Sequence, residues 1–229
     1  MRGGRLGTLL LTVFLTGPAA ATEAWHRCPG NGWEVTGADT HEHALVCEGV
    51  AGAAAVLASC GVGTKATTRI RVVDALPLSC GAPVWGLFDA VTDEITLGNP
   101  GTCVAEGPEG SLFRLIEAPL AFAAIAAHEA SHALLHAGGL GADRHLEHEY
   151  IAAVVQMQVL PEAARDAVLA PLRIGTDVGP WQLNPLILAL QPDLFAGLAW
   201  RHFATEEDGC AYMRALAEGT LRLPDYSAF

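Results

Sequence analysis

The sequence predicts an α+β fold in which a small β-sheet precedes a block of helices. Three short segments before residue 100 are rich in β-branched or alternating apolar residues, which is typical of strands: residues 67–73, 84–89 and 94–98. After residue 112 the apolar residues recur at helical spacing, and Pro and Gly mark the ends of the segments. Strands followed by helices, rather than alternating with them, indicate an α+β protein.

Local signals bound the individual elements. The segment Asp89 to Asp93 is expected to turn a hairpin between the second and third strands, and Asn99-Pro100-Gly101 ends the sheet. Residues 50–60 are Ala-rich and predict a short helix. Asn184-Pro185 reads as an N-cap followed by a first-turn proline. The helices expected in the second half cover about 119–137, 144–160, 161–171, 185–190, 192–203 and 206–218.

The first 21 residues resemble a signal peptide. Arg2 and Arg5 form a positive n-region, residues 6–15 are apolar, and Ala19-Ala20-Ala21 offers a cleavage site. The apolar run is too short for a stable membrane span, and later apolar stretches are interrupted by polar residues and proline. We therefore expect a secreted or periplasmic protein without a stable span after cleavage.

Six cysteines follow the expected cleavage site and suggest disulfides formed in an oxidising compartment. They are Cys28, Cys47, Cys60, Cys80, Cys103 and Cys210. Up to three bonds are possible, and spacing alone does not give their pairing. The absence of C-x-x-C spacing disfavours a cysteine zinc site. We expect one mature domain over residues 22–229, with a disulfide-stapled, β-rich part (22–110) and a helical part (111–229), which Cys210 ties back to the first.

Composition excludes several classes of partner. The formal net charge is −12, with only 13 Lys and Arg residues. A nucleic-acid-binding protein needs basic patches, and none is visible in the sequence. The same acidic character argues against binding to anionic membranes.

One run carries a recognisable chemistry: His128-Glu129-Ala130-Ser131-His132. Residues four apart lie on one face of a helix, so His128 and His132 can aim at one point and supply two corners of a tetrahedral metal site. Glu129 lies one residue further round the helix, where its carboxylate can take a proton from water activated by the metal. The alternative is an apolar core helix with satisfied histidines.

This motif resembles the zincin metallopeptidases. The metzincin extension is excluded, because Leu135 and Gly138 stand where it needs glycine and histidine. The gluzincin type takes a glutamate from the next helix, in several members as Glu-x-hydrophobic-Ala, and Glu149-Tyr150-Ile151-Ala152 is similar. The resemblance therefore implies Zn²⁺ held by His128, His132 and Glu149. Glu147 is the rival third ligand, and helical periodicity does not choose between the two glutamates.

Other polar residues remain candidates for supporting roles. His136, His145 and His148 flank the proposed ligands and are alternative ligands or surface groups, and His41 and His43 are expected at a strand edge or in a loop. Carboxylates that could orient the histidines are Asp143, Asp166 and Glu147. Downstream donors that could stabilise an oxyanion are Tyr150, His202, Tyr212 and Tyr226.

The resemblance also implies a substrate-binding strand. In zincins a small twisted sheet precedes the active-site helix, and the last strand before that helix is an edge strand that binds an extended substrate by backbone pairing. The matching strand by order is Glu94-Ile95-Thr96-Leu97. We therefore expect Ile95, Thr96 and Leu97 to contact substrate.

These observations predict an exported zinc metallopeptidase that acts on peptides or proteins with Glu129 as general base. A non-catalytic zinc-binding protein and a disulfide-rich envelope interaction protein are the alternatives. Glu129 favours the enzyme, because metal binding alone does not need that carboxylate. An intramembrane protease would need longer apolar spans.

Overall fold

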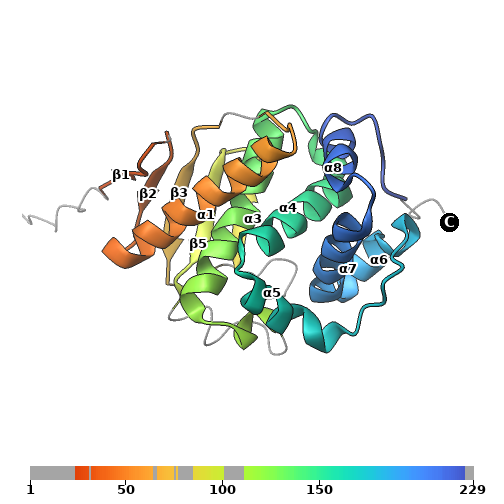
Figure 1. Cartoon of the computed structure of the whole chain (residues 1–229). Helices are drawn as coiled ribbons and strands as arrows, with labels where there is room; N and C mark the ends of the chain where they lie inside the picture. The colour runs from red at the N-terminus through yellow and green to blue at the C-terminus, as the bar shows by residue number, and fades with distance from the viewer. Residues whose placement is uncertain are drawn as a thin grey trace, which may run out of the picture.

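The computed structural model describes residues 24–30, 32–63, 66–74, 76, 85–100 and 111–224. Within them the fold is α+β, as predicted, with a small mixed sheet and a group of helices (Figure 1). The expected signal peptide, Cys80, Cys103 and Tyr226 lie outside the described residues.

The sheet has five strands in the order β1-β2-β3-β5-β4. Their bounds are β1 His26–Arg27, β2 Glu34–Thr36, β3 Arg69–Val73, β4 Gly86–Asp89 and β5 Glu94–Gly98. The central strands β2, β3 and β5 are parallel, while β1 and β4 pair antiparallel at the two edges. Ile70, Ile95 and Leu97 are fully buried and alternate with more exposed residues, as expected for a sheet covered on one face.

The helices follow the sequence signals closely in the second half of the chain. Their bounds are α1 Thr40–Ser59, α3 Ala118–Ala137, α4 His145–Val159, α5 Glu162–Leu169, α6 Pro185–Leu190, α7 Pro192–Thr205 and α8 Gly209–Ala217, with short 3₁₀ turns η1 Leu112–Leu115, η2 Ala142–Arg144, η3 Ala170–Leu172 and η4 Pro180–Gln182. Asn184 caps α6 through its side chain, as the sequence predicted. The Gly-rich loop after α3 returns α4 alongside it (Figure 1).

Helix α1 corrects the prediction for the N-terminal part. The helix was expected only from residue 50, with His41 and His43 in a strand edge or loop, but it begins at Thr40 and contains both histidines. Asp39 and Glu42 form a capping box: the Asp39 side chain accepts from the backbone of Glu42, and the Glu42 side chain accepts from that of Asp39. Residues 22–110 are thus not simply β-rich.

The position of β5 corrects the substrate-strand prediction. Strand β5 lies between β3 and β4, so both of its edges are paired, and β4 is the edge strand. Ile95 and Leu97 are fully buried on the inner face. Ile95, Thr96 and Leu97 therefore cannot bind a substrate by edge pairing. The expected hairpin is present, and its turn uses Asp93 at a φ of 53°.

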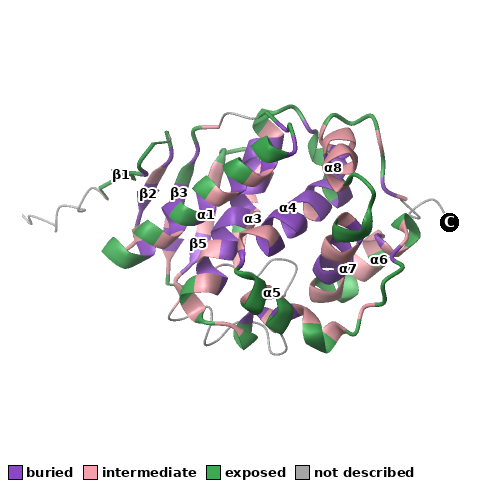
Figure 2. Cartoon of the chain, viewed as in Figure 1, coloured by how far each residue is buried: buried purple, intermediate pink, exposed green. Residues whose placement is uncertain are grey.

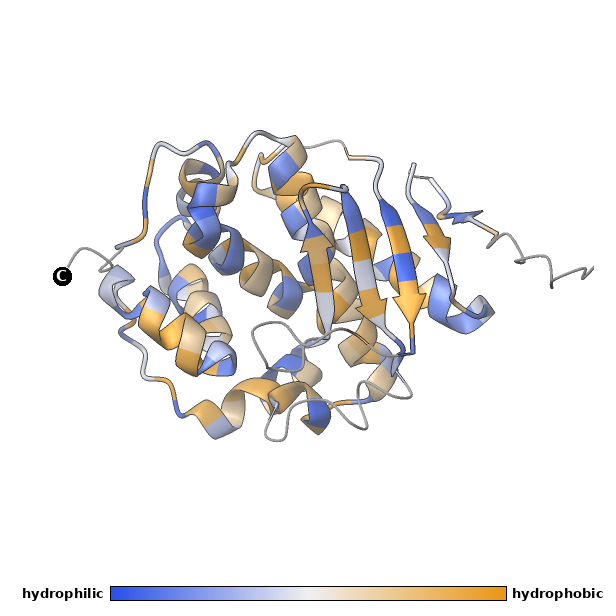
Figure 3. Ribbon diagram, turned by 180° about the vertical axis from the view of Figure 1, so that it is seen from behind, coloured by the Kyte–Doolittle hydropathy of each residue, from blue (hydrophilic) through white to orange (hydrophobic). Residues whose placement is uncertain are grey.

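Helices α1 and α3 pack closely against each other and cover one face of the sheet. Figure 3, seen from behind, shows the strands in front of the helices, and Figure 2 shows that α3 and α4 are largely buried. At the crossing, a Cβ atom on Gly49 would lie 2.3 Å from the carbonyl oxygen of Ala123. Glycine in α1 and alanine in α3 thus let the backbones of these two helices approach each other closely.

Two disulfides are present in the described part of the chain. Cys28 bonds Cys47 and staples β1 to α1. Cys60 bonds Cys210, 150 residues away, and joins the end of α1 to α8, as expected for Cys210. Arg214 of α8 reinforces this junction by donating to the Cys60 carbonyl at 3.0 Å. Two disulfides indicate an oxidising environment, extracellular or periplasmic.

By length and composition, α1 is the one helix among the described residues that passes as a candidate membrane span. This is weak evidence for a span, because core helices of soluble proteins pass the same test. Here α1 packs against α3 and α4 and carries a disulfide to β1.

The Gly49→Ala substitution should destabilise the protein. The added methyl would clash with the backbone of Ala123, which cannot rotate away as a side chain can. Overpacking of this kind typically costs about 1–3 kcal/mol. Gly52→Ala is the matched control on the same helix, because its Cβ would meet only a side-chain methyl of Val159 at 2.9 Å. Urea unfolding should show a lower free energy of unfolding for Gly49→Ala and a smaller change for Gly52→Ala. Equal stabilities would contradict this account of the crossing.

Candidate metal centre

Helix α3 presents two histidines on one face. His128 and His132 are one turn apart, and their Nε2 atoms lie 3.1 Å from each other. The remaining residues of the helix are mostly Ala and Leu, and most of them are buried. A pair of histidines on a mostly apolar, buried helix requires a binding partner, since unpaired polar groups are costly to bury.

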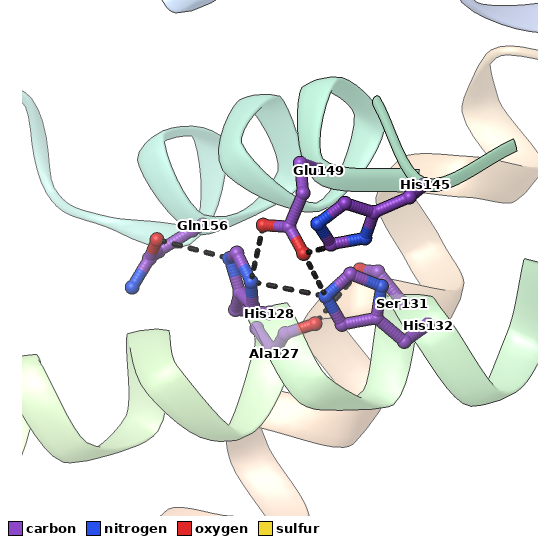
Figure 4. Close-up of polar contacts among 7 residues, drawn as sticks. All are labelled: Ala127, His128, Ser131, His132, His145, Glu149 and Gln156. Carbon is purple, nitrogen blue, oxygen red and sulfur yellow. Dashed lines mark hydrogen bonds and ion pairs between the residues drawn. The ribbon is translucent and has the colours of Figure 1, made fainter. Parts of the chain in front are cut away.

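Glu149 of α4 supplies that partner. Its Oε2 lies 3.5 Å from His128 Nε2, and its Oε1 lies 3.5 Å from His132 Nε2. Figure 4 shows the carboxylate pointing down from α4 between the two imidazole rings of α3. The ligating atoms of all three residues fall within 4.8 Å of one another.

This donor set fits a tetrahedral divalent ion. Zinc bonds of about 2.0–2.2 Å to nitrogen and oxygen place neighbouring ligand atoms about 3.3–3.6 Å apart. The three separations here, 3.1, 3.5 and 3.5 Å, are close to that range. Two imidazole nitrogens and one carboxylate oxygen supply three protein donors, which leaves the fourth tetrahedral position open.

Glu147 points elsewhere. Its Oε2 lies 3.3 Å from Arg144 Nε, and its Oε1 accepts the backbone N–H of Leu223 at 2.9 Å. Arg144 in turn donates to the carbonyls of Gly219 and Leu221. Glu147 therefore anchors the C-terminal segment to α4, and Glu149 alone of the two glutamates reaches the histidines.

The charges of the three groups depend on one another. Burial alone would raise the pKa of Glu149, but the two imidazoles lower it to about 2. Burial lowers the pKa of His132 to about 3, whereas His128 has a raised pKa because the hydrogen bond and charge of Glu149 outweigh its burial. His132 is thus neutral and ready to ligate, and ion binding must displace a proton from His128 at low pH.

Glu129 lies beside the three-residue group, under the edge strand β4. Its side chain is 8% exposed, and burial raises its pKa from 4.5 to about 7. The backbone N–H of Phe88 donates to its carboxylate. A Cβ atom on Gly86 would lie 2.6 Å from Glu129 Cγ, so only glycine lets β4 pass this close. A carboxyl poised near neutrality can accept and release a proton.

Gln156 is a site residue that sequence reasoning missed. Its Oε1 accepts from His128 Nδ1 at 3.2 Å, which directs Nε2 toward Glu149. The expected carboxylates do not play this part: Asp143 pairs with Arg222, Glu147 with Arg144, and Asp166 lies on α5. The sequence did contain a signal for Gln156. This glutamine interrupts an apolar run seven residues, or two helical turns, after Glu149.

The additional histidines surround the centre without joining it. His148 donates from Nε2 to the Leu140 carbonyl at 3.2 Å, and His136 packs against the Phe88 ring. His145 is largely exposed, and its Nδ1 lies 3.7 Å from Glu149 Oε1. This contact makes His145 a neighbour of the centre rather than a member of the convergent group.

Three of the four expected oxyanion donors lie away from the centre. The Tyr150 hydroxyl and His202 Nδ1 are hydrogen-bonded at 3.0 Å, and the Tyr212 ring packs against both. Glu206 lies 3.2 Å from the other ring nitrogen of His202. This cluster joins α4, α7 and α8 in the core. Tyr226 is outside the described residues.

A cavity of about 860 Å³ opens over the centre. Its described lining includes His128, Glu129, His132 and Glu149, together with a wall from β4 and another from η1, α6 and α7. Most of the walls are apolar, with Trp85, Phe88, Phe113, Leu188, Leu194 and Phe195 among them. Asp193 adds a third carboxylate, and the described lining contains neither Lys nor Arg.

The chain belongs to a family of unknown function, DUF6639, whose model matches residues 33–225. The match spans strands β2 to β5, the His-Glu-x-x-His helix and Glu149. Comparison with curated proteins and with solved structures found no match.

Replacing Glu149 with glutamine should abolish tight metal binding. We expect about one divalent ion per wild-type chain and an affinity reduced by more than about 100-fold in Glu149→Gln, since losing even the hydrogen-bond partner of a ligand costs about 10–100-fold. Glu147→Gln is the matched control: it should keep the ion but melt at a lower temperature, because it weakens a buried ion pair. Plasma emission spectrometry and thermal melts check both. Loss of metal in Glu147→Gln alone would reverse the assignment.

The metal-free protein should gain stability at neutral pH when Glu129 is replaced by glutamine. A carboxyl whose pKa is raised on folding destabilises the folded state once it ionises, so this cost grows as pH rises from 4.5 through about 7. The free energy of unfolding of Glu129→Gln should therefore match that of the wild type near pH 4.5 and exceed it by about 2–3 kcal/mol at pH 8. Urea unfolding of the metal-free proteins measures the difference. A difference independent of pH would contradict the buried position of Glu129.

Proposed function

We propose that the protein is an exported zinc-dependent metallopeptidase. The observation that carries the proposal is the convergence of His128, His132 and Glu149 on one point, with Glu129 beside them in the same cavity. Two imidazoles and a carboxylate form a ligand set of catalytic zinc sites, and the neighbouring carboxylate is the additional group that hydrolysis requires.

Each residue has a distinct role in the proposed reaction. His128, His132 and Glu149 hold the ion, and Gln156 keeps His128 in the ligating orientation. A zinc ion bound there lowers the pKa of water and polarises a carbonyl group. Glu129 accepts the proton of the attacking water and then delivers it to the leaving amine, for which a pKa of about 7 is suited.

Strand β4 is the proposed site for the substrate backbone. Gly98 N–H donates to the Trp85 carbonyl, so residues 85 and 87 pair with β5, while the backbone groups of Gly86 and Phe88 face the free edge. The Phe88 N–H donates to the Glu129 carboxylate. The remaining edge groups lie beside the cavity and can pair with an extended peptide.

The cavity chemistry favours neutral, apolar substrate side chains. Its walls are mainly aromatic and aliphatic, and its described lining provides three carboxylates and five histidines but neither Lys nor Arg. A free C-terminal carboxylate or an acidic side chain would find neither Lys nor Arg there to pair with. We therefore propose cleavage within a chain rather than removal of C-terminal residues. The oxidising environment indicated by the disulfides supports an exported protein.

A non-catalytic zinc-binding protein is the second candidate function. It is favoured by one observation: Tyr150, His202 and Tyr212, the described candidates for stabilising an oxyanion, form a core cluster and do not line the cavity. The buried Glu129, held at the cavity by β4, favours the enzyme.

Glu129→Gln separates the two functions. General base catalysis contributes about 10²–10⁴-fold, so this variant should lose at least 100-fold in kcat/KM while retaining one zinc per chain. The assay is cleavage of a mixed library of blocked neutral peptides, followed by mass spectrometry, with a chelator and zinc re-addition. Glu162→Gln, an exposed carboxylate on α5, is the matched control and should be unchanged. A zinc-loaded wild type that cleaves no peptide would favour the non-catalytic function.

A further inference from the structure

A second group of metal-ligating residues lies at the N-terminal end of α1, and the proposed function does not use it. His43 and Cys47 are four apart on one face of this helix. His26 and Cys28 are two residues apart, at and just after β1. The Cys28 N–H donates to the Trp33 carbonyl and so continues the pairing of β1 with β2. The Cys28–Cys47 disulfide brings the two pairs together.

The separations within this group are those of potential ligands. His43 Nε2 and Nδ1 lie 3.7 and 3.9 Å from Cys47 Sγ. The ligating atoms of Cys28, His43 and Cys47 all fall within 4.8 Å of one another. The His26 ring packs edge-on against the His43 ring, with 6.2 Å between the centroids, and is the next nearest potential ligand.

The spacing in sequence disfavoured a cysteine zinc site because no C-x-x-C pair occurs. The fold supplies the same chemistry from two different elements, an extended segment and a helix turn. Cys60 and Cys210 belong to neither group of potential metal ligands found among the described residues. The Cys60–Cys210 disulfide joins α1 to α8, whereas Cys28–Cys47 has the His43 imidazole against it.

We propose that reduction of Cys28–Cys47 creates a second metal site, in which Cys28, Cys47 and His43 bind a zinc-class divalent ion and His26 completes the tetrahedron. A dithiol reductant transfers two electrons and two protons to the disulfide, giving two thiols and an oxidised dithiol. The ion then displaces the two thiol protons, because thiolate is the ligating form. Disulfide and metal site exclude each other, so the redox state decides which one is present.

The required movement is small and lies at a free end of the sheet. Zinc–sulfur bonds of about 2.3 Å place two tetrahedral sulfurs about 3.8 Å apart, against about 2.0 Å in a disulfide. Strand β1 is two residues long, is at the sheet edge and pairs only with β2. Two thiolates also balance the charge of the ion, which matters because Cys28 and Cys47 are 2% and 9% exposed.

Cobalt spectroscopy of the full chain tests this site without any assay of activity. After reduction by a phosphine, which takes one water per disulfide and leaves two thiols and a phosphine oxide, Co²⁺ should give a thiolate-to-cobalt charge-transfer band. The oxidised protein should bind Co²⁺ at the His128 centre without that band. Cys28→Ser/Cys47→Ser, reduced in the same way, should lose the band.

Two histidine variants keep the test decisive if the serine variant folds poorly. His43→Ala should weaken Co²⁺ binding at the thiolate site at least tenfold, whereas His41→Ala, on the same turn and exposed, should not change it. If reduction unfolds the chain, Zn²⁺ should restore the helical circular dichroism of the wild type more than that of His43→Ala. No band in the reduced wild type, an unchanged band in the serine variant, or equal behaviour of the two histidine variants would overturn the proposal.

Discussion

The contact between the Glu149 carboxylate and the imidazoles of His128 and His132 is the constraint around which the two central helices are arranged. A carboxylate brought this far out of water is stable only if opposing groups replace its hydration. The two histidines do so, and they hold the pKa of Glu149 at about 2. The contact requires α3 and α4 to lie antiparallel at one fixed separation, and the Gly-rich loop between them permits that return.

The packing around helices α3 and α4 requires glycine at two positions. Gly49 lets α1 approach the backbone of α3, and Gly86 lets β4 pass over Glu129. Larger residues at either position would push α3 or β4 away and open the centre. Gln156 and Arg144 then fix the details: the first orients His128, and the second holds Glu147 out of the centre. The chemistry of the cavity depends on these close approaches as much as on the ligands themselves.

Glu129 illustrates a balance between its proposed function and the stability of the fold. Its carboxyl is buried under a strand edge with one backbone donor, and the resulting raised pKa destabilises the metal-free fold at neutral pH. Functional sites commonly carry such costs. The rest of the protein offsets them with a buried core and with two disulfides, one of which joins segments 150 residues apart. The same oxidising chemistry that closes Cys28–Cys47 keeps the proposed second metal site closed.

The sequence by itself determined the α+β order, the strands β3 to β5, the helices from α3 onward and the His-Glu-x-x-His face, because these follow from local periodicity and capping. It also contained a capping box at Asp39 and Glu42 whose signal was overlooked, so α1 was predicted ten residues too short. Only the tertiary structure decided what depends on distant partners. It made β4 rather than β5 the sheet edge, because strand order is set by crossovers that no local pattern records. It placed Glu149 at the histidines and Glu147 at Arg144, because neighbouring helical positions differ in direction and the loop fixes which one faces α3. It brought Cys28 close to His43 through the disulfide to Cys47, because a disulfide pairing is a contact in space and not a spacing in sequence.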